Sequence, residues 1–330
     1  MKTVLTGITP SGIPHLGNYI GAIKPSIEQS RQSGCQSLYF IADYHSLVKL
    51  QDAQLRQQYV YEIAAAWLAL GLDPEHTVFY RQSDIPEIPE LAWILSTVAS
   101  KGLLNRAHAY KDQVAKNVEQ ALDADAAITM GLFCYPVLMT ADILAFNADV
   151  VPVGKDQAQH LEIARDIALR FNHIYGDVFH IPEASIDEAG KTLPGLDGRK
   201  MSKSYQNTIP IFLPEKQLRK QVMKIKTNSQ LPEEPKDPTH CSVFQIYQNV
   251  APAAAVEDLR QRYLAGGLGW GEAKQILFEA LSAALAEPRA RYEALMVDTA
   301  YIDRVLQAGA EKARVQSRQV LADVYRAVGL

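Results

Sequence analysis

In the first half of the chain, short continuous apolar runs alternate with segments in which apolar residues recur at helical spacing. Apolar runs of strand length begin at Val4 and cover 37–42, 77–80 and 149–153, as expected for strands buried on both faces of a parallel sheet. Between these runs, apolar residues recur at the three- and four-residue spacing of amphipathic helices. Such alternation predicts an α/β fold built on a doubly wound parallel sheet. The predicted helices cover 16–27, 53–70, 91–98 and 161–171.

The second half shows a helical period only. This change predicts two domains, a sheet-containing domain over 1–205 and an all-helical domain over 206–330 that ends in a long closing helix. Within the first domain, residues from about 105 to 131 are rich in Ala, Asp and Gly and show little periodicity. We expect a mobile surface segment there. The apolar stripes of the helical domain cover 258–264, 271–285, 289–297 and 303–328.

The charge of the chain is unevenly distributed, although the net value for all 330 residues is only −4. Residues 1–198 contain 14 Lys and Arg against 23 Asp and Glu, a net of −9, whereas residues 199–330 contain 19 against 14, a net of +5. Part of the excess is a basic run, which fits either a solvated helix face or a surface for a polyanion such as RNA. The run consists of Lys216, Arg219, Lys220, Lys224 and Lys226.

Composition disfavours several other classes of protein. No apolar run reaches the ~18 residues that a membrane span needs. The first residues lack the apolar core of a secretory signal, so we expect a cytoplasmic protein without membrane contact. Cys35, Cys134 and Cys241 lie far apart, and we therefore expect buried free thiols, no disulfide and no protein-ligated metal.

A glycine- and proline-rich turn follows the first predicted strand and leads into a helix that begins His15-Leu16-Gly17-Asn18. Unpaired backbone N–H groups and the positive end of the helix dipole make such a helix start suitable for a phosphate. His15 has a ring N–H for phosphate oxygens, and Gly17 allows a flat base to approach the backbone. The glycines match neither a dinucleotide-binding fingerprint nor a P-loop. Alone, the pattern fits a plain turn and amphipathic helix equally well.

An apolar helix predicted over 133–144 contains one acidic residue. Tyr135, Met139 and Asp142 lie at positions i, i+4 and i+7, so they share one face. A carboxylate in such surroundings is costly without a donor, which makes a ligand N–H or O–H a candidate partner. A core helix with one capped or salt-bridged acid is the alternative. The carboxyl ends of the parallel strands, at 7–11, 43–45 and 81–84, are expected to face the same crevice.

A second motif, Lys200-Met201-Ser202-Lys203-Ser204, lies on a glycine-rich loop. Two lysines three residues apart, flanked by hydroxyl groups, form a flexible clamp for a polyphosphate and stabilise the charge that develops on a departing pyrophosphate. One such motif also occurs by chance on surface loops. Together with His15-Leu16-Gly17-Asn18 after a first strand, chance becomes a poor explanation.

With both motifs, the chain resembles the class I aminoacyl-tRNA synthetases, specifically the bacterial tryptophanyl family, over essentially its whole length. The resemblance implies a Rossmann catalytic domain, a helical domain that reads the tRNA anticodon, and a homodimer. It also implies the reaction: L-tryptophan and ATP, accompanied by Mg²⁺, give Trp-AMP and pyrophosphate, and tryptophan is then transferred to tRNA(Trp).

The resemblance implies roles for individual residues. Asp142 would accept the indole N–H, and Tyr135 and Gln157 would hold the α-amino group. The lysines Lys200 and Lys203, with His15, would act on the phosphates. The remaining tryptophan-binding residues would be Leu5, His45, Met139, Val151 and Val153, and the remaining ATP-binding residues would be Thr9, Pro10, Ser11, Gly17, Asn18, Gly154, Lys155, Asp156, Leu193, Met201, Ser202 and Ser204.

Two alternatives stay open at this point. The tyrosyl-tRNA synthetases share the architecture and both motifs, and a carboxylate such as Asp142 accepts from a phenol as readily as from an indole. Met139 favours tryptophan, because a thioether suits an indole face. The other alternative is an inactive paralogue that binds RNA or acts as a scaffold, against which the intact lysines and Asp142 argue.

Overall fold

The computed structural model describes residues 2–154, 158–186 and 192–330. Its sheet has five parallel strands in the order β3-β2-β1-β4-β5. The four strands that the apolar runs predict are confirmed, and β5 is an addition that the sequence analysis did not predict. The strands are β1 (Lys2–Ile8), β2 (Cys35–Ile41), β3 (Val78–Arg81), β4 (Val150–Val153) and β5 (Glu183–Ile186).

Strand β2 shows why the sheet is apolar on both faces. Leu38 and Phe40 belong to one buried cluster, while Tyr39 and Ile41 belong to another. Side chains of successive residues point to opposite faces of a strand, so an uninterrupted apolar run fills two cores at once. On one face Trp67 lies between aromatic rings, with its centroid 5.2 Å from that of Tyr39.

The chain adds β2 and β3 on one side of β1 and then β4 and β5 on its other side, so β1 pairs with both β2 and β4. In open α/β sheets this switch point is where ligands bind, outside the carboxyl ends of the strands. The helices around the sheet are α1 (Leu16–Asn18), the π-helical turn η1 (Tyr19–Ile23), α2 (Lys24–Ser30), α3 (Asp43–Ser46), α4 (Ala53–Ala69), η2 (Gln82–Asp84), α5 (Glu87–Ser96), α6 (Lys101–Leu104), α7 (His108–Glu119), α8 (Met130–Leu144) and α9 (Ala158–Tyr175).

The second half is helical, with one correction to the predicted boundaries. The stripes over 271–285 and 289–297 belong to a single helix, α13, that continues through Pro288. Leu285 and Tyr292 are buried on either side of this proline, and their packing offsets the lost backbone hydrogen bond. The elements are η4 (Lys203–Tyr205), α10 (Glu215–Met223), α11 (Ser242–Tyr247), α12 (Ala253–Ala265), α13 (Trp270–Val297) and α14 (Thr299–Val328).

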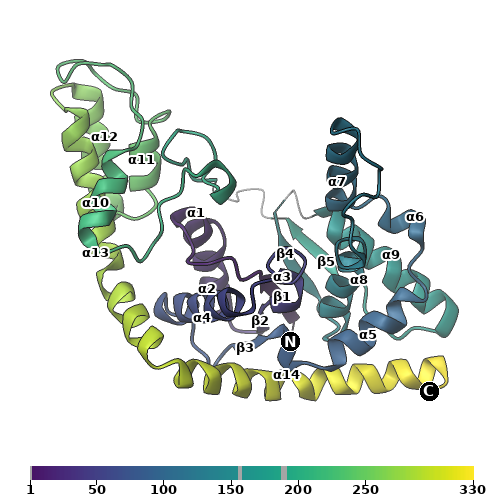
Figure 1. The fold of residues 1–330 in the computed structure, drawn as a ribbon. Helices are drawn as coiled ribbons and strands as arrows, with labels where there is room; N and C mark the ends of the chain where they lie inside the picture. The colour runs from purple at the N-terminus through teal and green to yellow at the C-terminus, as the bar shows by residue number, and fades with distance from the viewer. Residues whose placement is uncertain (1, 155–157, 187–191) are drawn as a thin grey trace.

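Helix α14 returns from the helical part to the sheet and runs along its base (Figure 1). It packs most closely at Gly309, where a Cβ atom would lie 1.8 Å from the carbonyl oxygen of Phe79 in β3. Further along, Arg314 bonds Glu87 of α5, with 2.9 Å between Nη2 and Oε1. The closing helix that the sequence predicts is therefore also a support of the sheet.

Three smaller expectations have mixed outcomes. Of the segment expected to be mobile, residues 108–119 form helix α7. Cys241 is buried as expected, whereas Cys35 and Cys134 are half-buried. All three are free thiols. Across the described residues, no helix combines the length and the apolar character needed to cross a membrane.

Candidate active site

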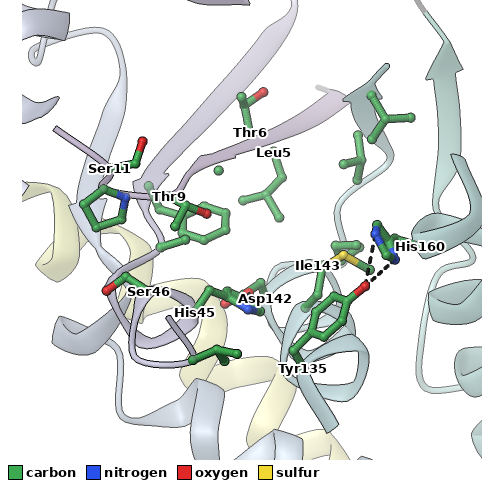
Figure 2. A pocket seen from close by; sticks show the side chains of 18 of the residues that line it. Leu5, Thr6, Thr9, Ser11, His45, Ser46, Tyr135, Asp142, Ile143 and His160 are labelled. Atoms are coloured by element: carbon green, nitrogen blue, oxygen red, sulfur yellow. Dashed lines mark hydrogen bonds and ion pairs between the residues drawn. The ribbon is translucent and has the colours of Figure 1, made fainter. Parts of the chain in front are cut away.

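A cavity of about 820 Å³ opens at the carboxyl ends of the strands, beside the switch point. Figure 2 shows Leu5 and Thr9 from β1 and the turn after it, His45 from α3, and Tyr135 and Asp142 from α8 around one space. Eleven of the residues expected to bind tryptophan or ATP line it: Leu5, Thr9, Pro10, Ser11, His45, Tyr135, Met139, Asp142, Val151, Val153 and Gly154.

Asp142 lies in the wall of this cavity and is only 1% exposed. Its Oδ1 accepts a hydrogen bond of 2.7 Å from Nε2 of Gln82. Its Oδ2 lies 2.8 Å from Nε2 of His45, and because a carboxylate only accepts, the histidine donates. The chain itself therefore gives both oxygens a partner, as in the alternative of a salt-bridged acid, so Asp142 does not depend on a ligand for its hydrogen bonds. Each oxygen keeps a lone pair for a further donor.

Burial raises the pKa of the Asp142 carboxyl, and the hydrogen bonds from His45 and Gln82 oppose that rise. Gln82 is fully buried at the end of β3 and is itself fixed, since its Oε1 accepts from the backbone N–H of Tyr44. The acceptor thus has a fixed position before any ligand arrives. Preorganisation of this kind lowers the cost of binding a matching N–H donor.

Tyr135 closes the other side of the cavity. Its hydroxyl lies 3.0 Å from Nδ1 and 3.1 Å from Nε2 of His160 in α9, and both side chains line the cavity. Burial raises the pKa of Tyr135 to about 12, with a smaller contribution from Asp112. The phenol therefore stays protonated and polar at neutral pH, at the edge of a cavity whose walls are mainly apolar.

The first motif begins helix α1 with a reciprocal cap. Nδ1 of His15 accepts from the backbone N–H of Asn18 at 3.2 Å, and Oδ1 of Asn18 accepts from the backbone N–H of His15 at 3.2 Å. Burial, with a smaller contribution from the positive charge of the nearby Lys203, lowers the pKa of His15 to about 4. The ring is therefore neutral near pH 7, and because Nδ1 accepts, its proton is on Nε2. This leaves one N–H donor, as a phosphate ligand requires.

The second motif lies directly against the first, although the two are far apart in sequence. Sδ of Met201 accepts from the backbone N–H of Gly17 at 3.3 Å, and Nζ of Lys203 donates to the carbonyl oxygen of Ser11. A Cβ atom at Gly17 would lie 3.0 Å from the His15 ring and 3.4 Å from Cβ of Met201. A side chain at position 17 would therefore crowd the His15 ring of its own motif, while the second motif lies at van der Waals distance. The structure brings together the two motifs, which the sequence places 182 or more residues apart.

Three predicted ligand residues, Lys155, Asp156 and Gln157, lie outside the described residues. Leu193 is buried beside the second motif, where its carbonyl oxygen accepts from the backbone N–H of Met201. Over 2–154, 158–186 and 192–330, no group of three or more His, Cys, Asp or Glu side chains is arranged to hold a metal ion.

Three residues of the site were missed by the sequence analysis. Gln82 falls within the strand end at 81–84 that the fold rule directs to the crevice, but its residue type gave no reason to single it out. His160 lies on the polar side of an ordinary amphipathic helix. Asn207 follows the second motif and bonds several atoms of its loop; only the local Asn-in-a-turn preference points to it.

Known proteins match this chain over its full length. Residues 1–286 match the family model described as tRNA synthetases class I (W and Y). The tryptophan--tRNA ligase of Pseudomonas aeruginosa is 56% identical over 330 residues, 99% of this chain and 73% of that protein. That of Neisseria meningitidis serogroup A is 52% identical, over 100% of this chain and 98% of that protein.

A solved structure agrees with the sequence comparison. Tryptophanyl-tRNA synthetase from Campylobacter jejuni, in a crystal structure complexed with ADP and tryptophan, superposes with a TM-score of 0.91 at 45% identity. The match covers 99% of this chain and 100% of that chain. With a cavity at the switch point, and with Lys203 of the second motif bonded to Ser11 in the cavity wall, the chain belongs to the class I tRNA synthetases, and within them to the bacterial tryptophanyl-tRNA synthetase family.

Proposed function

We propose that this chain is a tryptophan--tRNA ligase, which activates L-tryptophan with ATP to Trp-AMP and pyrophosphate and then transfers the amino acid to tRNA(Trp). The observation that carries the proposal is the preorganised Asp142 carboxylate in a mainly apolar cavity. Lys203 of the second motif donates to Ser11, which lines the same cavity. The full-length relatives named as tryptophan--tRNA ligases support the same substrate.

The geometry divides the cavity between the two substrates. The indole N–H would donate to Asp142, with the ring against Met139, Val151 and Val153, and the amino group would lie near Tyr135 and Gln157. ATP would occupy the rim, with its adenosine near Gly17, Asn18, Gly154, Asp156 and Leu193.

The chemistry requires no protein nucleophile, because the tryptophan carboxylate attacks the α-phosphorus of ATP and pyrophosphate leaves. The neutral His15 would donate Nε2–H to a phosphate oxygen, and Lys200 and Lys203 would stabilise charge on the leaving pyrophosphate. Mg²⁺ would enter as a part of the ATP substrate, held by phosphate oxygens, which are the hard ligands that it prefers.

The tRNA would bind the helical part, through the basic face of α10. Lys216, Arg219, Lys220 and Lys224 are all exposed there. Replacing Lys216, Arg219 and Lys220 together should weaken tRNA binding and reduce its salt dependence, while pyrophosphate exchange, which needs no tRNA, stays near wild type. Loss of exchange in a folded triple variant would contradict this assignment.

We further propose a cytoplasmic homodimer. Trp93 in α5 and Met130 in α8 are 74% and 70% exposed, and Pro89, one helical turn from Trp93, lines a second cavity of about 420 Å³ together with Leu47. An exposed apolar surface of this kind is suited to a second copy of the chain. Light scattering should give twice the chain mass for wild type and a monomer for Trp93→Glu.

The decisive experiment is ATP–pyrophosphate exchange with each of the twenty amino acids. Exchange with tryptophan alone is the expected result. Exchange with tyrosine would move the chain to the tyrosyl group, and exchange with no amino acid by a folded, tRNA-binding protein would indicate an inactive paralogue.

A further inference from the structure

The loop of the second motif is arranged around a side chain outside the motif, that of Asn207, which is 2% exposed. Its Oδ1 accepts from the backbone N–H of Ser202 at 2.8 Å. Its Nδ2 donates to Oδ1 of Asp197 at 2.7 Å and to the carbonyl oxygen of Lys200 at 3.1 Å. One amide group thus bonds the backbone on both sides of Met201, in the middle of the motif.

The backbone of the loop leaves little room for another arrangement. The carbonyl oxygen of Asn207 accepts from the N–H of Leu196 at 2.9 Å. A Cβ atom at Gly195 would lie 2.3 Å from the Asn207 amide, so the loop passes directly over it. Any side chain at Gly195 would push the loop off Asn207.

Asp197 links the amide to the rest of the loop. Its Oδ1 also accepts from the N–H of Arg199 at 3.1 Å, and its Oδ2 accepts from Nε of Arg199 at 2.7 Å. The hydrogen bond from Asn207, followed by those from Arg199, lowers the pKa of Asp197 to about 2. The carboxylate is therefore charged throughout the working pH range and accepts from both residues at once.

We propose that Asn207 is a positioning residue for adenylate formation: it fixes the peptide units of Lys200 and Ser202 and so sets where the side chains of Lys200 and Lys203 leave the loop. The inference rests on the proposed function, because it needs the two lysines to act on ATP. Asn207 itself touches no reacting atom. Its effect belongs in the rate of activation, since charge stabilisation by positioned groups is strongest in the transition state.

The test is an exchange of amide and carboxylate between positions 207 and 197. Asn207→Asp keeps the shape and the acceptor for Ser202 but directs a carboxylate oxygen at Asp197 and at the carbonyl oxygen of Lys200. Loss of these bonds should lower kcat of single-turnover adenylate formation roughly 10- to 100-fold. The KM for tryptophan should stay within about threefold of wild type, because the tryptophan pocket is untouched.

The double variant Asp197→Asn with Asn207→Asp again pairs an amide with a carboxylate. The amide at position 197 would now donate to the carboxylate at position 207. It should recover several-fold of the lost kcat, because it restores the contact between positions 197 and 207 but not the one to the Lys200 carbonyl. Independent losses of stability would not produce such a recovery. Asn172 provides a matched control, because it also fixes a loop: its Oδ1 accepts from the N–H groups of Val178 and Phe179, and its Nδ2 donates to the carbonyl oxygen of Phe179. Asn172→Asp should lower thermal stability without lowering kcat.

The outcomes are distinguishable. An inactive wild-type chain would overturn both the proposed function and this inference. Active wild type with Asn207→Asp within about threefold in kcat would overturn the inference alone. A double variant no faster than Asn207→Asp, or an equal loss of kcat in Asn172→Asp, would also overturn it, because either result reduces Asn207 to a general support of the fold.

Discussion

Replacing Asp142 by alanine tests how the cavity selects its amino acid. The substitution removes the acceptor for the indole N–H, and it also strands Nε2 of the fully buried Gln82, which donates to Asp142 at 2.7 Å. We therefore expect two separate effects, one on tryptophan activation and one on the stability of the free protein.

The magnitude for tryptophan follows from one hydrogen bond to a charged group. Such a bond contributes about 1.5–3 kcal/mol, so kcat/KM for tryptophan should fall roughly 10- to 200-fold. The stranded amide of Gln82 should cost about 1–3 kcal/mol of folding free energy, partly offset because the buried charge is gone.

Phenylalanine offers no N–H, but it would not leave Asp142 unpaired, because His45 and Gln82 already bond the carboxylate. Sites whose polar groups lose their only partner reject analogues by ~10⁴–10⁵. Here the carboxylate should account for only the roughly 10- to 200-fold preference that one hydrogen bond provides. Activation of phenylalanine should therefore change little in Asp142→Ala, and the ratio of tryptophan to phenylalanine should fall by that factor.

The assay is ATP–pyrophosphate exchange for both amino acids, with unfolding followed in urea. Met139→Leu is the control, since it keeps the volume beside the ring and should cost at most ~1.5 kcal/mol. Tryptophan kcat/KM within about threefold of wild type in Asp142→Ala would mean that Asp142 only supports His45 and Gln82. A selectivity change of ~10⁴ would instead mean that the chain partners do not satisfy the carboxylate.

Three further predictions concern other parts of the chain. Lys203→Ala should lower kcat for adenylate formation ~10²–10³-fold with little change in the KM for tryptophan, measured by single turnover; a loss below about threefold would contradict its role at the phosphates. Gly309→Ala should lower the free energy of unfolding, measured in urea, by ~2 kcal/mol or more, because the new Cβ atom would collide with the Phe79 carbonyl oxygen. This loss should exceed the ~1 kcal/mol by which alanine normally stabilises a helix relative to glycine. Gly271→Ala is the control, since Gly271 has open space around it and the substitution should not destabilise the fold. The pKa of His15 is about 4 in the folded protein and 6.5 in the unfolded chain, so the unfolded chain takes up the proton first as the pH falls. The free energy of unfolding should therefore be highest above pH 6.5 and should decrease by up to about 2 kcal/mol between pH 6.5 and 5, and by less in His15→Asn. Equal slopes of unfolding free energy against pH in the two proteins would refute the lowered pKa.

The sequence predicted the parts of this molecule that depend on period and on local motifs. Continuous apolar runs located four strands, two of them only four residues long. The strand β5 has the sequence Glu-Ala-Ser-Ile, which contains no such run, so the pattern did not predict it. The predicted break between 285 and 289 was wrong, because α13 continues through Pro288. Tertiary packing stabilises the helix there, and hydrophobic periodicity does not reveal such packing. The sequence paired the two motifs only because both occur in one α/β chain. The contact between them, from the backbone N–H of Gly17 to Sδ of Met201, required the structure.

The sequence singles out candidate site residues where a residue type carries chemistry by itself. A lone aspartate in an apolar helix and two lysines on a loop stand out in any sequence, so the sequence analysis could name Asp142, Lys200 and Lys203. Gln82 and Asn207 act only through bonds to other site residues. Neutral amides of this kind are common throughout a chain, and the contacts that distinguish them are long-range or buried, so a sequence pattern does not single them out.

The position of α14 has a consequence for how the chain folds during synthesis. β3 lies at an edge of the sheet, and its Arg81 bonds Asp303 of α14, which is 222 residues later in the chain. Until the ribosome has added those residues, the edge of β3 and the apolar faces beneath it stay open to other chains. Closing so long a loop is slow. We therefore expect a chaperone that binds nascent chains to remain on the β3–α5 region until α14 emerges.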